Sequence, residues 1–81
     1  MIVSGVVVKV TPGSEAECAR HLSRSPGTRV EAVEPGNLAL VMEAQDSRAL
    51  LETTRRWQEE VSGIQGVYPT FIGRHESESP E

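Results

Sequence analysis

The chain has 81 residues, of which 37% are hydrophobic and 25% charged, the size and balance of one small folded domain. Its net charge of -4 argues against a nucleic-acid partner, because binding phosphate needs a basic surface, but this charge suits a basic peptide. A single cysteine permits no internal disulfide, and the first residues lack the basic start of a secretion signal, so we expect a cytoplasmic protein without a membrane span.

The first two elements are predicted by a run of β-branched residues and by the signals that end it. Residues 2–10 are rich in valine, as a strand is, and a Thr-Pro-Gly turn follows them. Ser14 and Glu17 then have the spacing of a capping box, in which side chains satisfy free backbone amides of the first turn. A helix is therefore expected over residues 15–23.

A β-hairpin is expected in the middle of the chain. Residues 28–34 alternate between charged and apolar side chains, as a half-buried strand does. Pro35 and Gly36 are typical of a tight turn, and residues 38–44 alternate again as the returning strand.

The second half of the chain predicts one more helix and one more strand. Asp46 or Ser47 can cap a helix over residues 47–61. Residues at helical spacing should form its buried side, namely Leu50, Thr54, Trp57 and Val61. The last strand is expected over residues 67–73, where Pro69 favours an edge position or a bulge.

The order of these elements predicts an α+β fold of the ferredoxin-like βαββαβ kind. Because strand–helix–strand crossovers are right-handed, both helices are expected on one face of a four-stranded antiparallel sheet. We assign this domain to residues 1–73. Residues 74–81 are polar and acidic, and we expect them to form a disordered tail.

The alternation of each strand predicts which residues lie on which face of the sheet. The face toward the helices should carry Val6, Val8, Val10, Val30, Ala32, Leu38, Leu40 and Met42. The opposite face should carry Gly5, Val7, Lys9, Arg29, Glu31, Val33, Ala39, Val41 and Glu43. With no third layer to cover it, this small and apolar surface bordered by charges favours a platform for a peptide. The alternative is an ordinary solvated face with a few valines.

Patterns that indicate catalysis or metal binding are missing from the sequence. Cys18 has no histidine in an assignable position beside it and is interpreted as a small core residue. Metallochaperones of this fold carry a Cys-x-x-Cys pair in the loop at residues 11–14, which here has no thiol. RNA-binding domains of this fold carry aromatic residues on the first and third strands, and this chain carries none there. We therefore expect no enzymatic activity, no cofactor, no metal and no nucleic acid.

Several segments of the chain resemble the NapD family of assembly chaperones. They are Ser4-Gly5-Val6-Val7-Val8, Thr11-Pro12, Pro26-Gly27 followed by Val30, residues 36–44, and Gly66-Val67. The most specific is the Gly-x-Leu-x-x-Val-x-Glu-Ala strand at residues 36–44, which stands just before an acidic helix cap. The resemblance covers nearly the whole chain except the tail.

The resemblance implies a cytoplasmic chaperone that binds the twin-arginine signal peptide of the molybdenum-containing catalytic subunit of periplasmic nitrate reductase. Such proteins delay export by the Tat machinery until the cofactor is inserted, and they use the open face of the sheet. The signal-peptide site then comprises Gly5, Val7, Lys9, Glu31, Ala39, Val41 and Glu43. Its valines and alanine would form an apolar floor, and its glutamates would accept the planar fork of each arginine.

Two other functions remain compatible with the predicted fold. A ligand-sensing domain of the ACT or Lrp-tail kind would need a glycine-rich effector loop after the first strand, and residues 11–14 are a poor version of one. A dimeric monooxygenase of this fold would need polar residues around a cavity between sheet and helices, and the sequence offers no such set.

Overall fold

The computed structural model describes residues 1–74. Its elements are β1 (Ile2–Val10), α1 (Glu15–Ser23), β2 (Thr28–Glu34), β3 (Asn37–Ala44), α2 (Ser47–Glu60) and β4 (Ile64–Arg74). All six expected elements are present, and the main difference is that β4 begins at Ile64 instead of residue 67. Of the expected tail, Arg74 ends β4, and residues 75–81 lie outside the described residues.

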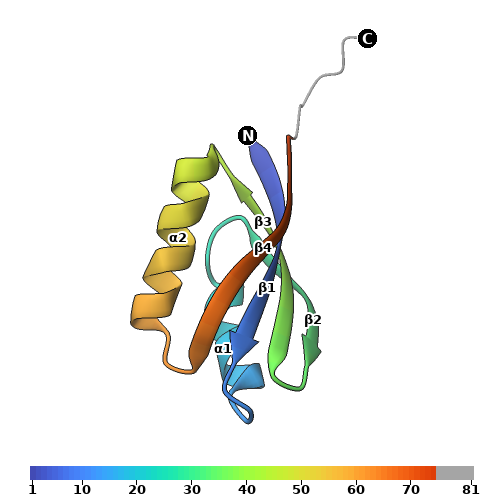
Figure 1. The fold of residues 1–81 in the computed structure, drawn as a ribbon, viewed down its shortest axis with the longest axis vertical. Coiled ribbons are helices and arrows are strands. Elements are labelled where there is room, and N and C mark those ends of the chain that lie inside the picture. The colour runs from blue at the N-terminus through green and yellow to red at the C-terminus, as the bar shows by residue number, and fades with distance from the viewer. Residues whose placement is uncertain (75–81) are drawn as a thin grey trace.

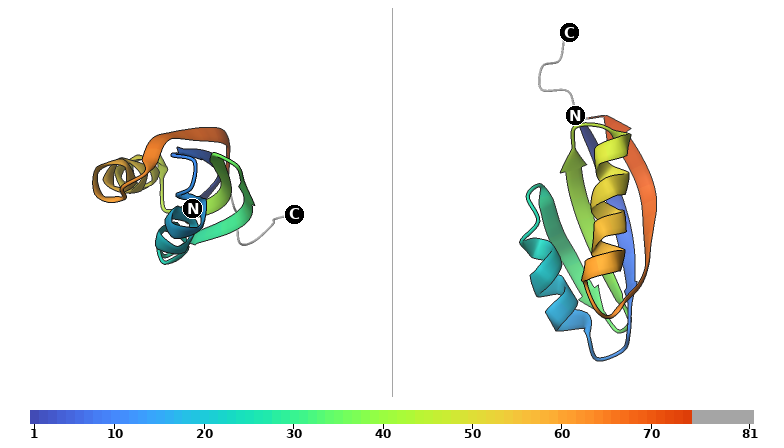
Figure 2. Two further views of the ribbon diagram at one scale, coloured as in Figure 1. Left: turned by 90° about the horizontal axis from the view of Figure 1, so that it is seen from below. Right: turned by 90° about the vertical axis from the view of Figure 1, so that its left-hand side faces the viewer.

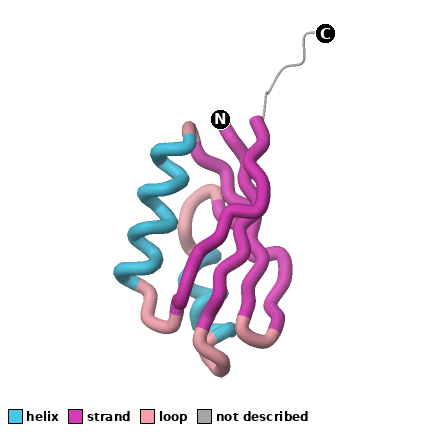
Figure 3. The backbone as a smooth tube through the Cα atoms, viewed as in Figure 1, coloured by secondary structure: helices cyan, strands magenta, loops and turns pink. Residues whose placement is uncertain are grey.

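The four strands form one antiparallel sheet in the order β2-β3-β1-β4. Both helices lie on the same face of this sheet, as Figure 1 shows from the side and Figure 2 from the end and from the helix side. Each connection has four residues or fewer, which holds every helix close to the strands it joins (Figure 3). The ferredoxin-like fold expected from the sequence is confirmed.

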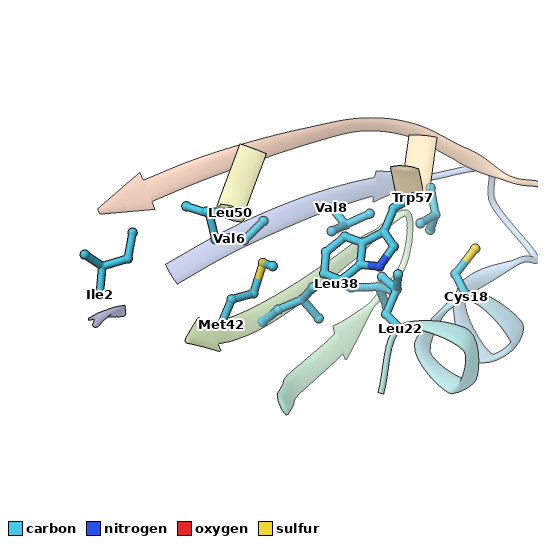
Figure 4. Close-up of a cluster of buried hydrophobic side chains, with 11 residues drawn as sticks. Ile2, Val6, Val8, Cys18, Leu22, Leu38, Met42, Leu50 and Trp57 are labelled. Carbon is cyan, nitrogen blue, oxygen red and sulfur yellow. The ribbon is translucent and has the colours of Figure 1, made fainter. Parts of the chain in front are cut away.

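The hydrophobic core lies between the helices and this one face of the sheet (Figure 4). Its buried side chains are Ile2, Val6, Val8, Val10, Cys18, Leu22, Leu38, Leu40, Met42, Leu50 and Trp57. The central strand β1 supplies Ile2, Val6, Val8 and Val10 to this cluster, because side chains alternate between the faces of a strand, and the polar Ser4 of the same series is also buried. Trp57 of α2 also donates a hydrogen bond from its indole Nε1 to Ser25 Oγ at 3.0 Å, which joins α2 to the loop after α1.

A β-bulge in β2 overturns part of the predicted distribution of residues between the faces. Val30 pairs with Leu40 as expected, but the next paired residue is Ala32, which lies opposite Ala39. Glu31 is therefore the extra residue, and the alternation of β2 is reversed beyond it. Ala32, predicted to face the helices, lies on the other face, and Val33, which pairs with Leu38, lies on the helix side.

The start of α1 is also built differently from the capping box that the sequence indicates. Ser14 is the N-cap residue, but its side chain makes no capping hydrogen bond. Instead, the Glu15 carboxylate accepts hydrogen bonds from the amides of Gly13 at 3.0 Å and Gly36 at 2.8 Å. Glu15 thus ties α1 to the β2–β3 hairpin. At α2, Asp46 acts as the expected cap and accepts from the amide of Ala49 at 2.9 Å.

These hydrogen bonds to Glu15 predict an acid-dependent loss of stability. The Gly36 amide is the largest cause that holds the pKa of the Glu15 carboxyl below its ordinary value, and the amides of Glu15 and Gly13 add to it. The carboxyl of a glutamate in an unfolded chain has a pKa of about 4.3. Since the folded carboxyl has the lower pKa, its contribution is complete above the unfolded value and is lost as the pH falls through the folded value.

Replacing Glu15→Gln should therefore lower the free energy of unfolding most at neutral pH, and the gap to the parent should be smaller at about pH 3. Urea denaturation at both pH values measures the gap. Glu17→Gln is the matched control, since Glu17 lies in the same helical turn and its side chain accepts no backbone hydrogen bond within the described residues. A gap for Glu15→Gln that is equal at both pH values would contradict the assignment.

Trp57→Ala should cost about 3–5 kcal/mol of stability, because it leaves a cavity among the core residues and removes the hydrogen bond to Ser25. Trp57→Phe keeps a ring in the core and loses the hydrogen bond, so a smaller cost is expected for it. Denaturant unfolding followed by circular dichroism measures both. A loss under about 1 kcal/mol for Trp57→Ala would place the indole outside the core.

Candidate peptide-binding site

The face of the sheet away from the helices, called the open face here, consists of four rows of residues paired across the strands. Read from β4 to β2, the rows are Gly73–Val3–Glu43, Phe71–Gly5–Val41–Arg29, Tyr68–Val7–Ala39–Ala32 and Gly66–Lys9–Asn37–Glu34. The two middle rows are apolar apart from Arg29, and the outer rows carry the charges. The two middle rows thus form an apolar band across all four strands. An outer row with charged residues flanks this band on each side.

Of the residues that the sequence assigned to this face, Val33 lies on the helix side, and the others are on or at the edge of the open face. Gly5, Val7, Ala39 and Val41 occupy the centre of the apolar band, on the adjacent strands β1 and β3. Lys9 and Glu43 lie in the two outer rows, at opposite ends of the sheet. Glu31 lies at the bulge on the edge strand β2.

The Phe71 ring of β4 lies over Gly5 of β1 on the open face. A Cβ atom built on Gly5 would lie 2.4 Å from Cε2 of the Phe71 ring, so this ring occupies the space that a side chain at position 5 would fill. The ring is nevertheless 57% exposed. Ser4 holds the backbone beneath it, since its Oγ donates a hydrogen bond to the Phe71 carbonyl at 2.8 Å.

Tyr68 lies over a second glycine of the same face. Its hydroxyl would be 2.4 Å from a Cβ at Gly66, so the ring runs back along β4 toward the row of Lys9. Tyr68 is 54% exposed. The apolar band therefore ends at β4 in two aromatic rings that are half open to solvent.

Two shallow hollows, each of about 240 Å³, lie on the β2–β3 half of the open face. One is lined by Gly27, Thr28, Arg29, Val41 and Glu43. The other is lined by Val7, Glu34, Asn37, Leu38 and Ala39. The first hollow combines Val41 with the oppositely charged residues Arg29 and Glu43, and the second combines apolar residues with the carboxylate of Glu34. Both carboxylates are on strands.

The charged residues of β2 interact with one another. Arg29 donates from Nε to the carboxylate of Glu31, in an ion pair whose arginine side chain is 75% exposed. Glu31 is the main cause that raises the pKa of Arg29, and Glu43 adds to it through its charge. Glu31 is thus already neutralised by Arg29, whereas Glu34 and Glu43 have no ion-pair partner among the described side chains.

A comparison with known protein families settles the relationship of this chain. The family model described as "NapD protein" matches residues 1–78. The chain belongs to the NapD family. Among solved structures, the solution structure of the E. coli Tat proofreading chaperone protein NapD is similar to it, with 26% identity and a TM-score of 0.76. The match covers 98% of this chain and 83% of that chain. No curated protein sequence matches.

Membership of the NapD family and the likeness to a chaperone of that family support a chaperone role rather than an enzymatic one. Neither helix of the described chain is long and apolar enough to cross a bilayer. Within residues 1–74, no three histidine, cysteine, aspartate or glutamate side chains gather into a set that could hold a metal ion.

The sequence analysis did not assign Tyr68, Phe71 and Glu34 to the open face, nor the smaller or less charged residues Val3, Ala32, Asn37, Gly66 and Gly73. Tyr68 and Phe71 are three positions apart, and simple alternation would place them on opposite faces. Thr70 is unpaired between Phe71, opposite Gly5, and Pro69, opposite Val6, and this bulge brings both rings to one face. Glu34 reaches the open face through the bulge at Glu31. The only signal was Pro69, which correctly predicted an edge strand or a bulge.

The remaining candidates of the sequence analysis lie away from the open face. Cys18 is buried, as expected of a core residue, and its thiol points to the Ser62 carbonyl at 3.6 Å. Burial raises the pKa of this thiol, and the nearby carboxylates of Glu17 and Glu15 add to the effect. In the loop that a ligand sensor would use, the Gly13 amide donates to Glu15 and the Ser14 amide donates to the Thr11 carbonyl, so neither is free to hold an effector.

The position of the Phe71 ring over Gly5 can be tested by replacing this glycine with alanine, which adds a methyl group. Gly5→Ala should displace the ring and cost about 1–3 kcal/mol of stability, because its Cβ would also lie 2.7 Å from Thr70 Oγ1. Changes in the ring-current shifts of Val7 and Val41 would report the displacement by NMR. Gly73→Ala is the matched control on the same face, since its nearest neighbour would be at an ordinary 3.9 Å. Equal effects of the two substitutions would show that Phe71 does not rest on Gly5.

Proposed function

We propose that this chain binds the twin-arginine signal peptide of the catalytic subunit of a periplasmic nitrate reductase on its open face. By holding the peptide in the cytoplasm, it delays export through the Tat pathway until the molybdenum cofactor is inserted. The observation that carries the proposal is the apolar band across the sheet with carboxylates at its borders. The family of the chain and the printed name of its E. coli relative, a Tat proofreading chaperone, support the same function.

The apolar band supplies the part of the site that a signal peptide needs for its hydrophobic segment. Val7, Ala39 and Val41 are half-buried rather than covered, so a bound peptide would remove their remaining apolar surface from water. This term is non-directional and tolerates different apolar sequences. An apolar surface of this kind therefore suits a ligand whose segment must be hydrophobic but need not have one particular amino-acid sequence.

The carboxylates at the border supply selectivity for arginine. A carboxylate accepts the two parallel N–H groups of a guanidinium, which a lysine cannot offer. Exposed pairs of this kind contribute only about 0.2–1 kcal/mol each. The apolar contacts thus provide much of the affinity, and the charged residues provide much of the specificity.

The shallowness of the site fits a chaperone that must release its client. Both hollows are open depressions on a sheet surface, and the two aromatic rings stay more than half exposed. A ligand on such a surface can leave without a large rearrangement of the domain. The site residues assigned by sequence, Gly5, Val7, Lys9, Glu31, Ala39, Val41 and Glu43, form the proposed site together with Glu34, Tyr68 and Phe71.

Calorimetric titration with a twin-arginine signal peptide tests the proposal. Val41→Glu should weaken binding by about tenfold or more, because it places a charge in the apolar floor. Glu43→Lys should weaken it severalfold at low salt and less at high salt, because salt screens exposed charges.

Two substitutions on the outer side of α2 are matched controls. Leu51→Glu and Glu52→Lys make the same changes at exposed positions of the helix, far from the open face, and should leave binding unchanged. The proposal would be wrong if the parent protein bound no twin-arginine peptide, or if all four variants bound as the parent does.

A further inference from the structure

The open face is divided into two halves of different chemistry along the direction that crosses the strands. All three carboxylates of the sheet, Glu31, Glu34 and Glu43, are on β2 and β3. On β1, Lys9 is the one charged residue, and residues 64–73 of β4 include none. The β2–β3 half thus carries all three carboxylates together with Arg29 and the apolar residues Ala32, Ala39 and Val41, and its net charge is negative. The β1–β4 half of the open face is apolar apart from Lys9.

The β1–β4 half contains most of the aromatic surface of this protein. The chain has one tryptophan, one tyrosine and one phenylalanine. Trp57 is in the core, whereas Tyr68 and Phe71 both lie on the open face and are each more than half exposed. Both rings lie over glycines, Gly66 and Gly5, which leaves room for them to lie close to the sheet. Exposed aromatic rings on a rigid strand are typical anchors for apolar groups of a partner.

We propose that the signal peptide lies across the strands in one direction, with its arginines over β2–β3 and its apolar segment over β1–β4. The inference rests on the proposed function and adds an orientation to it. Signal peptides carry their positive charges before their apolar segment. The amino-terminal part of the peptide therefore lies at the β2 edge, and the chain runs from there toward Tyr68 and Phe71.

The two carboxylates without an ion-pair partner among the described side chains are the acceptors for the arginines. Glu34 lines a hollow that contains no cationic side chain, whereas Glu43 shares its hollow with Arg29, which is itself paired with Glu31. Glu34 is therefore the better placed of the two acceptors. Arginine can also stack on aromatic rings. The hydroxyl end of the Tyr68 ring, however, lies over Gly66, which pairs with Lys9. The charged residue in that row is therefore a lysine, which repels an arginine, and not a carboxylate, which would attract it.

The dimensions of the sheet allow both halves to be occupied by one peptide. Adjacent strands are about 4.8 Å apart, so the centre of β2 is roughly 14 Å from the centre of β4. This distance equals about four residues of an extended peptide or about nine residues of a helix. The arginines and the first large apolar side chains of one signal peptide can thus reach the two halves at the same time.

Paramagnetic labelling of the peptide tests the orientation on the unaltered protein. A nitroxide at the amino terminus of a twin-arginine peptide should broaden the NMR amide signals of residues 29–33 in β2 more than those of residues 66–71 in β4. A nitroxide after the apolar segment should give the reverse. Opposite patterns, or equal broadening of both strands by each label, would overturn the orientation while binding itself still supported the proposed function. No binding at all would overturn both.

Double-mutant cycles test which side chains meet which part of the peptide. Glu34→Gln and Phe71→Ala are each combined with a peptide lacking one arginine and with a peptide whose first apolar leucine is alanine. Glu34→Gln should couple about threefold or more with the arginine change and combine independently with the leucine change, and Phe71→Ala should show the opposite. Coupling of Phe71 to the arginine, or no coupling in either cycle, would contradict the proposed division of the site.

Discussion

The alternation of β1 between a covered and an uncovered face is the constraint on which the rest of this structure depends. Right-handed crossovers place both helices on one side of the sheet, so only one set of β1 side chains can be buried beneath them. Val6, Val8 and Val10 are almost completely buried on that side. The other set has no layer of this chain to cover it among the described residues. The open face is thus a direct consequence of the fold, and its composition is what the protein has available for a partner.

Three register shifts on the edge strands, two in β4 and one in β2, interrupt this simple alternation. In β2, the extra residue Glu31 brings Ala32 and Glu34 to the open face, and in β4 the extra residue Thr70 brings Phe71 to the same face as Tyr68. Bulges are most easily accommodated at edges, because only one neighbouring strand has to adjust. The central strands β1 and β3 keep a continuous register and hold the core. The central strands therefore carry both the core and, on their other side, Gly5, Val7, Ala39 and Val41 of the open face, and the edge strands add the aromatic rings and Glu34.

In the proposed complex, the division of charge across the open face lets the domain recognise a ligand by pattern rather than by sequence. Hydrophobic contact over β1 and β4 accepts many apolar segments, and carboxylates on β2 and β3 favour a guanidinium at one end. Neither half is deep, so neither holds a ligand tightly by itself. A chaperone that retains its client for a limited time needs affinity from several weak contacts, and those contacts can be lost one after another.

The sequence by itself determined the six elements, their order and the helix-facing residues of β1 and β3, because local periodicity and turn residues specify these without distant contacts. It also identified Val7, Ala39 and Val41 as uncovered, since regular alternation held on those two strands. Only the tertiary structure decided the rest. A bulge forms where pairing with a neighbouring strand requires it, so the faces of Ala32, Glu34 and Phe71 follow from strand register rather than from local sequence. The role of Glu15 depends in the same way on a hairpin 21 residues away, whose Gly36 amide became its partner in place of an ordinary helix cap.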